Sequence, residues 1–116
     1  MSGINLDGKV FYALSNSNDG DVDHRTHFYY HQKDDYIWAH YKGGRVATGV
    51  LIGKVLEGSK LNFTYSHFDQ EGIFKAGKCE SQILILHDGS IKLEEEWEWT
   101  TGNRSKGQST LLEKKD

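Results

Sequence analysis

Residues 90–99, with the sequence SIKLEEEWEW, show the clearest periodicity in this chain of 116 residues. Apolar and charged side chains alternate along most of the stretch, which is the pattern of a β-strand with one buried face. The apolar positions are Ile91, Leu93, Trp97 and Trp99, and the charged positions are Lys92, Glu94, Glu96 and Glu98. Glu95 breaks the pattern, because alternation places it on the apolar face. A buried carboxylate is costly unless it is paired or hydrogen-bonded, so we expect polar groups inside the fold to contact Glu95.

The rest of the chain has the composition of short strands joined by tight turns. It contains no proline, thirteen glycines and fourteen aromatic residues, and glycine supplies the positive φ angles that hairpin turns require. Besides residues 90–100, the pattern predicts strands at residues 10–14, 26–32, 36–42, 45–55, 59–68, 73–86 and 106–113. The connections are too short for crossovers, so consecutive strands are expected to pair in antiparallel order.

These strands predict an all-β fold, an up-and-down antiparallel β-barrel of about 8 to 10 strands. Closure is favoured because an open meander of this size would leave two exposed edges. A single domain spanning residues 1–116 is expected, since a chain of this length buries about 65% of its unfolded surface around one core.

A repeated Gly-x-x-x-x-Gly pattern supports closure of the barrel. Its members are Gly44/Gly49, Gly72/Gly77 and Gly102/Gly107. The first glycine of each pair is expected in a turn, with all three turns at one end of the barrel. The second is expected a few residues into the next strand, where it would permit a bulge or the sharp coiling of a small barrel.

The charge and cysteine content restrict the partners and the compartment. A formal charge of −3 and a pI near 6.0 give no basic face for nucleic acid or for an acidic membrane. Cys79 is the single cysteine, so no intramolecular disulfide can form. The sequence shows neither a signal-peptide pattern nor about 18 consecutive apolar residues. We expect a cytoplasmic protein, a monomer or homodimer, that binds neither nucleic acid nor membranes.

Residues 15–25 form the longest polar segment and are expected to cover one mouth of the barrel. Asp19, Asp21 and Asp23 suggest a calcium loop. However, His24 and Tyr30 stand where such a loop needs glycine and glutamate, so a solvated loop is the better interpretation.

The histidines of the next segment do not form a convincing zinc site. His27 and His31 share one strand face, but their backbones would lie ~13 Å apart, too far for one ion. No metal site and no cofactor is predicted. Instead, an outer face rich in histidine and aromatic residues is expected, and it would suit an interaction surface or homodimer seam. Its members are His27, Tyr29, His31, Tyr36, Trp38 and His40.

The inward faces of the predicted strands combine aromatic walls with hydrogen-bonding groups, which is typical of a small-molecule site. The candidate ligand-binding residues are Gln32, Tyr41, Phe63, Tyr65, His67, Cys79, Ser81, Glu95, Trp97 and Trp99. In this hypothesis Gln32 and Tyr41 donate hydrogen bonds, and Glu95 fixes a polar or cationic group of an unknown, partly aromatic ligand. The alternative is a filled core in which these polar groups bond to one another around trapped water.

Catalysis is a second hypothesis. His67, Cys79 and Glu95 come from consecutive strands and could serve as base, nucleophile and orienting carboxylate of hydrolase-type chemistry. A lone inward cysteine is more often a small buried hydrophobic residue.

The chain also resembles a family of small, uncharacterised bacterial proteins. The residues that carry the resemblance include Glu95-x-Trp97-x-Trp99 and Ser105-x-Gly107-x-Ser109, and the match extends over residues 28–113. Members often carry the automatic name N-acetylglutamate synthase, and their strand pattern is similar to calycin barrels such as lipocalins and fatty-acid-binding proteins. The resemblance therefore implies a calycin-like barrel.

The acetyltransferase activity in that name does not fit the residues of this chain. Acetyl coenzyme A commonly binds a Gln/Arg-x-x-Gly-x-Gly/Ala turn at the N-terminus of a helix. The nearest match, Arg104 to Ser109, ends in serine and leads into a predicted strand. A small enzyme thus remains only an alternative to a binding protein.

Overall fold

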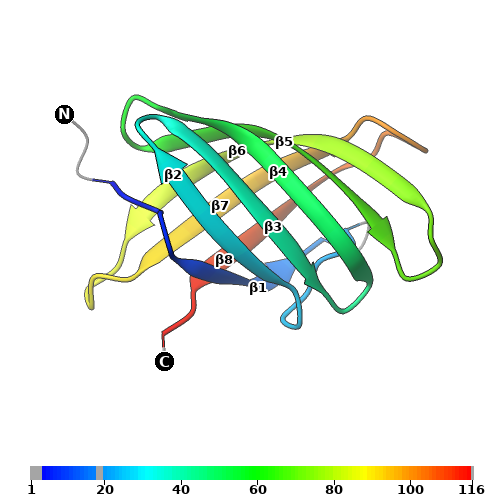
Figure 1. Ribbon diagram of the computed structural model, residues 1–116, viewed down its shortest axis with the longest axis horizontal. Helices are drawn as coiled ribbons and strands as arrows, with labels where there is room; N and C mark the ends of the chain where they lie inside the picture. Colours follow the sequence, from blue (N-terminus) through cyan, green and yellow to red (C-terminus); the bar gives the residue numbers. More distant parts are fainter. Residues whose placement is uncertain (1–3, 18–19, 116) are drawn as a thin grey trace.

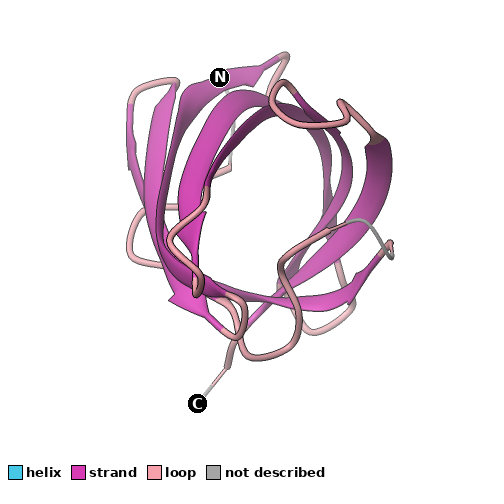
Figure 2. Ribbon diagram, turned by 90° about the vertical axis from the view of Figure 1, so that its right-hand side faces the viewer, coloured by secondary structure: helices cyan, strands magenta, loops and turns pink. Residues whose placement is uncertain are grey.

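The computed structural model describes residues 4–17 and 20–115, and this part of the chain forms one closed barrel of eight strands. The strands are β1 (Val10–Asn16), β2 (His27–Lys33), β3 (Tyr36–Gly43), β4 (Val46–Leu56), β5 (Lys60–Asp69), β6 (Phe74–Ile85), β7 (Ile91–Trp99) and β8 (Lys106–Glu113). Each strand pairs with the next in antiparallel order, and β8 closes the ring against β1 (Figures 1 and 2). The predicted all-β, up-and-down barrel is confirmed.

The strand bounds agree with the sequence pattern to within two residues at every end. The largest difference is in β1, which continues to Asn16 instead of ending at Leu14. A register shift between Ala13 and Ser15 lets the strand continue, and Asn16 then pairs with Ser109 of β8. This extension brings the Asn16 side chain to the barrel interior.

One end of the barrel is closed by aliphatic side chains. It carries the β2–β3, β4–β5 and β6–β7 turns, on the left of Figure 1. Leu6, which precedes β1, is fully buried here, and its backbone N–H donates to Gln32 Oε1 at 2.9 Å. Other buried residues of this end are Phe11, Ile37, Val55, Leu61, Ile83, Ile91, Leu93 and Leu111. The N-terminal segment therefore completes a solid core.

The glycine repeat has a structural role that differs from the expected one. Gly44, Gly72 and Gly102 lie in turns with positive φ, as predicted. The second glycines each pair with an inward aromatic residue of the preceding strand: Gly49 with Tyr41, Gly77 with Tyr65 and Gly107 with Trp97. A Cβ at any of them would collide with that ring. The bulge alternative was wrong for these glycines, because the register shifts near the β3–β4 turn lie at other residues; the alternative of sharp coiling stays a prediction.

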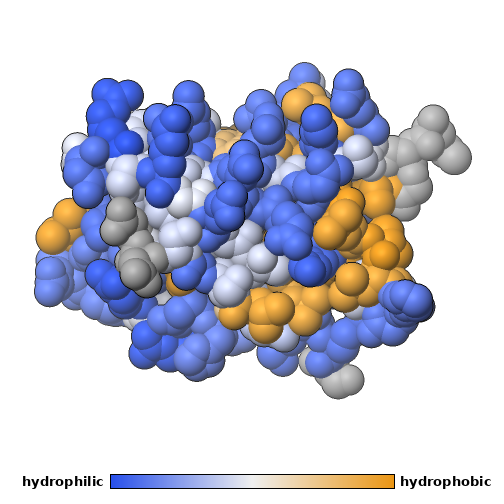
Figure 3. All heavy atoms as spheres, turned by 180° about the vertical axis from the view of Figure 1, so that it is seen from behind, coloured by the Kyte–Doolittle hydropathy of each residue, from blue (hydrophilic) through white to orange (hydrophobic). Residues whose placement is uncertain are grey.

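The outer surface differs between the faces of the barrel. Hydrophilic side chains cover most of the face formed by β6, β7 and β8, while hydrophobic ones gather toward the closed end, where Leu84 and Ile85 are exposed (Figure 3). On the β2–β4 side, the predicted aromatic strip does point outward, and Trp38 is 43% exposed. Within the described ranges, no helix is long and apolar enough to cross a membrane.

Candidate functional site

The other end of the barrel, which we call the mouth, contains a partly open cavity of about 50 Å³. One water molecule occupies about 10–15 Å³ of such a space, so the cavity exceeds that of a single trapped water. Eight of the ten predicted site residues line it: Tyr41, Phe63, Tyr65, His67, Cys79, Glu95, Trp97 and Trp99. The cavity is also lined by Phe28, Leu51 and Ser109, and by Asn16, Gly20, Asp21 and Val22 at the mouth.

Aromatic rings form a nearly continuous wall around the cavity. Phe28 stacks on Tyr41 with ring centroids 4.9 Å apart, and Tyr41 meets the His67 ring edge-on at 5.6 Å. His67 in turn contacts Trp99 at 5.7 Å, and Trp99 contacts Trp97 at 5.6 Å. These contacts exist because every second residue of a strand faces the interior, and because the paired glycines leave room for the rings.

Trp97 is fixed in place by a hydrogen bond as well as by packing. Its indole Nε1–H donates to Asn16 Oδ1 at 2.9 Å, and Asn16 Nδ2 donates to the Val22 carbonyl at 3.1 Å. The extension of β1 thus connects the aromatic wall to the β1–β2 loop. A buried indole N–H usually needs such a partner.

Glu95 lies in the wall of the cavity, where it is only 7% exposed. Ser81 of β6 donates to its Oε2 and Ser109 of β8 donates to its Oε1, both at 3.0 Å. Burial raises the pKa of Glu95 to about 7, although the two serine hydrogen bonds oppose the shift. Neutral hydroxyls compensate an ionised carboxylate only in part. Glu95 therefore gains or loses its proton near neutral pH.

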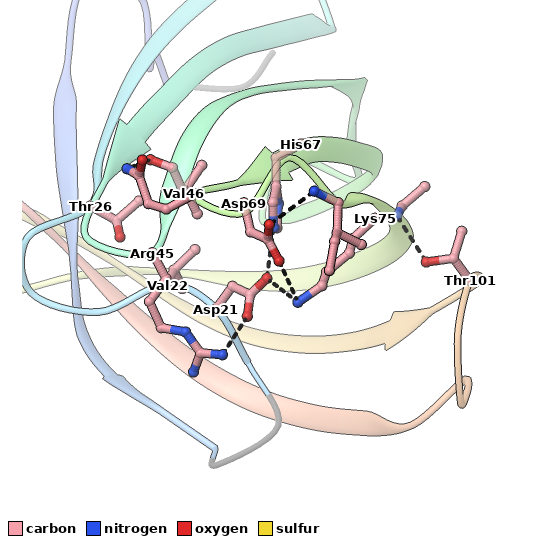
Figure 4. Close-up of polar contacts among 12 residues, drawn as sticks. Asp21, Val22, Thr26, Arg45, Val46, His67, Asp69, Lys75 and Thr101 are labelled. Atoms are coloured by element: carbon pink, nitrogen blue, oxygen red, sulfur yellow. Dashed lines mark hydrogen bonds and ion pairs between the residues drawn. The ribbon is translucent and has the colours of Figure 1, made fainter.

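A second buried carboxylate lies at the mouth. Asp21, in the β1–β2 loop, is 4% exposed and contacts residues from three other elements (Figure 4). Its Oδ2 accepts hydrogen bonds from His67 Nε2 at 2.9 Å and Lys75 Nζ at 2.8 Å, and its Oδ1 lies 3.6 Å from the Arg45 guanidinium. Burial opposes ionisation, but the His67 and Lys75 contacts outweigh it and lower the pKa of Asp21 to about 2.

Asp21 also fixes the orientation of the His67 ring. An ionised carboxylate only accepts hydrogen bonds, so the Nε2 of His67 carries the proton. In the neutral ring Nδ1 is then an acceptor, and the Tyr41 hydroxyl, 2.9 Å away, donates to it. The chain Tyr41–His67–Asp21 therefore holds one wall of the cavity in a defined arrangement beneath the β1–β2 loop.

Comparison with known proteins agrees with this architecture. The family model described as "Avidin-like protein" matches residues 4–114, which is nearly the whole chain. The chain belongs to the avidin-like family. Avidin-like proteins are eight-stranded antiparallel barrels of the calycin superfamily, so the calycin-like resemblance is confirmed, whereas nothing supports the synthase name. A comparison with curated protein sequences gave no match.

Two predicted site residues of this avidin-like barrel lie outside the cavity wall. Gln32 is at the closed end, where it accepts from Leu6 and its Nε2 donates to the carbonyl of Asp34 at 2.9 Å. The structure therefore does not bring Gln32 to the other candidates. Ser81 lies behind Glu95 and contributes through its hydrogen bond to that carboxylate.

The proposed catalytic grouping of His67, Cys79 and Glu95 is not assembled in the avidin-like barrel. Both ring nitrogens of His67 bond to Tyr41 and Asp21 instead of Cys79. Burial, followed by the nearby Glu95, raises the pKa of the Cys79 thiol, whose Sγ contacts Ser81 Oγ at 3.8 Å. The thiolate needed for nucleophilic attack is thus disfavoured, and this alternative was wrong in its geometry.

The β1–β2 loop of the avidin-like chain is more than the solvated segment that its composition suggested. Its residue Asp21 is buried, and Gly20 and Val22 line the cavity at the mouth. Asp21 does not share a calcium-type site with Asp23, whose carboxylate pairs with Arg25 at 2.6 Å. Asp19 lies outside the described residues. Among the residues described, no group of three or more His, Cys, Asp or Glu side chains could hold a metal ion.

Proposed function

We propose that this avidin-like chain binds a small molecule in the cavity at the mouth of the barrel. One observation carries the proposal: the core is filled with aliphatic side chains at the closed end, but at the mouth it leaves a cavity walled by aromatic rings and one buried carboxylate, Glu95. Concave aromatic walls with a few convergent polar groups are the usual features of a ligand site. The small-ligand character of avidin-like barrels is consistent with this.

Further support comes from Tyr30, a residue of β2 that the site hypothesis had not included. Its side chain is almost completely buried, and its hydroxyl has no hydrogen-bond partner among the described residues. Burial raises the pKa of Tyr30, and the charge of Glu95 adds to this effect. Tyr30 does not itself line the cavity, but a buried donor without a partner is uncommon in a filled core.

Intrinsic tryptophan fluorescence provides a direct test. Trp97 and Trp99 line the cavity, whereas Trp38 is on the outer surface. A Trp38→Phe variant therefore confines the signal to the two cavity tryptophans. Titration of this variant with a library of small polar aromatic and amine compounds is expected to yield ligands that change the emission and raise the melting temperature.

A matched pair of variants locates the binding site. Leu51→Phe adds volume at the cavity wall, while Val50→Phe adds the same ring to the outer face of β4, where Val50 is 56% exposed. Leu51→Phe should abolish binding and Val50→Phe should preserve it. Equal binding by both variants, or no response of Trp97 and Trp99 to any compound, would contradict the proposal.

A further inference from the structure

The cavity combines two features that attract positive charge. The faces of its aromatic rings carry partial negative charge, which favours a cation within about 6 Å of a ring centroid. Glu95 adds a carboxylate in the same wall, and no ion pair involves it among the described residues. The charge of a buried carboxylate without a cation is incompletely compensated, so a positively charged ligand would stabilise the ionised form of Glu95.

The charged groups at the mouth compensate one another in close ion pairs, and Lys75 Nζ also lies 5.9 Å from the centroid of the Trp99 ring. Lys75 Nζ lies 2.8 Å from Asp21 and 3.4 Å from Asp69, and Arg45 lies 3.6 Å from Asp21. Figure 4 shows these contacts gathered on the loop side of His67. Two cations and two carboxylates thus form a balanced rim, and Glu95 is the uncompensated charge of the cavity.

We propose that the ligand is a small organic cation, a protonated amine whose ammonium group binds Glu95 and whose apolar part packs against Trp97 and Trp99. This inference rests on the proposed function. Each Glu95 oxygen accepts one serine hydrogen bond, which leaves lone pairs for ammonium N–H donors. The small cavity favours a compact amine.

Glu95 is the group in this interior whose charge such a ligand would change. The titratable side chains that face it come from β2, β3, β5 and β6: Tyr30, Tyr41, Tyr65 and Cys79. Burial raises the pKa of all four, so they remain neutral over the range in which Glu95 ionises. An ammonium ion therefore competes with a proton for Glu95, and binding should strengthen as the pH rises toward neutrality.

The test uses probes that are matched in shape and differ in charge. Propylammonium and benzylammonium are titrated into the Trp38→Phe variant, with propanol and benzyl alcohol as neutral counterparts and propionate and benzoate as anionic ones. We expect the amines to bind at least about ten-fold more tightly than the alcohols near pH 8. Their affinity should fall about 30-fold at about pH 5.5, where only a small fraction of Glu95 is ionised, while any alcohol binding stays constant.

The Glu95→Gln variant separates the ligand class from the proposed function. It keeps the shape of the side chain and one accepting oxygen, replaces the other oxygen by an NH2 donor, and cannot become charged, so both the amine preference and its pH dependence should disappear. Binding of alcohols or carboxylates in the cavity with no binding of amines would overturn the cationic ligand and leave the binding function standing. Amine binding unchanged by Glu95→Gln would also overturn it. No change in the emission of Trp97 and Trp99 with any amine, alcohol or carboxylate would overturn both the cationic ligand and the binding function.

Discussion

The two ends of the barrel are built from the same eight strands but have different interiors. At the closed end, aliphatic side chains such as Ile37 and Leu61 are fully buried. At the mouth, aromatic rings surround a cavity, and two carboxylates, Asp21 and Glu95, are buried. The comparison shows how a small barrel can combine stability with a site: one end supplies apolar burial, and the other accepts groups that are costly to bury.

The two carboxylates illustrate different degrees of compensation at the mouth. Asp21 accepts hydrogen bonds from His67 and Lys75, and its pKa falls to about 2. Glu95 receives only the hydroxyls of Ser81 and Ser109, and its pKa rises to about 7. The ionised form of Asp21 therefore stabilises the folded state, whereas ionisation of Glu95 destabilises it.

The largest effect is expected from a truncation at the closed end. Ile37→Ala removes a fully buried side chain and should reduce the free energy of unfolding by about 2–5 kcal/mol, because the lost apolar contacts leave a cavity. Ile52→Ala is the matched control on the next strand, since Ile52 is 66% exposed, and should change stability by less than about 0.5 kcal/mol. Urea unfolding measures both. Comparable losses in the two variants would contradict the division between core and surface.

A second prediction concerns the pH dependence that Glu95 imposes. Its pKa is about 7 in the folded state and 4.5 ordinarily, so the folded protein binds more protons between these values and stability falls as the pH rises through about 7. Glu95→Gln should remove this fall and make the variant more stable by about 3 kcal/mol near pH 8, with little difference near pH 4. Chemical unfolding across this range checks the prediction. The neighbouring Glu96→Gln, on the exposed face, should keep the wild-type profile.

Asp21 should show the opposite sign. Its pKa is lowered from 3.8 to about 2, so its contribution is present above about pH 4 and is lost as the pH falls through about 2. Asp21→Asn should reduce the free energy of unfolding by about 2 kcal/mol near pH 7, and by roughly half as much near pH 3. Asp23→Asn is the control in the same loop, because Asp23 pairs with exposed Arg25, and should cost less than about 1 kcal/mol. A pH-independent loss in Asp21→Asn would contradict the assignment.

The smallest effect is expected at the outer part of the mouth network. Arg45 is 63% exposed and lies 3.6 Å from Asp21, so Arg45→Ala should cost less than about 1 kcal/mol. The loss should shrink at high ionic strength, because salt screens an exposed pair. Urea unfolding at low and high salt measures it. A loss as large as that of Asp21→Asn would mean that Arg45, rather than His67 and Lys75, compensates the buried carboxylate.

Much of the fold could be predicted from the sequence because its signals are local. Alternation of apolar and polar residues along 91–99 identified the β7 strand and its inward face, and the same period placed Phe63, His67 and Cys79 inside. Short turns fixed the antiparallel order. The bulge in β1 escaped prediction, because it depends on pairing with β8, a strand almost 100 residues away in sequence.

The site was predictable on the strands but not in the loop. Glu95 stood out because its charge conflicts with the apolar period, and the polar groups expected to meet it are Ser81 and Ser109, which pair with it in register. Asp21 gave no such signal, since a loop has no period that distinguishes inward from outward residues. Its burial depends on His67 and Lys75, which are at least 46 positions away in sequence. The cytoplasmic location and the role of the outer aromatic strip stay predictions.

The pairing of glycines with aromatic rings gives the barrel a way to change the shape of its cavity in small steps. Gly49, Gly77 and Gly107 each leave space for one ring of the wall. A single added methyl group at Gly49 or Gly107 would displace the Tyr41 or Trp97 ring and reshape the cavity without replacing a residue that lines it. At Gly77 it would also meet the backbone carbonyl of Glu98, so Gly49 and Gly107 are the two positions from which a neighbouring strand can adjust the cavity wall.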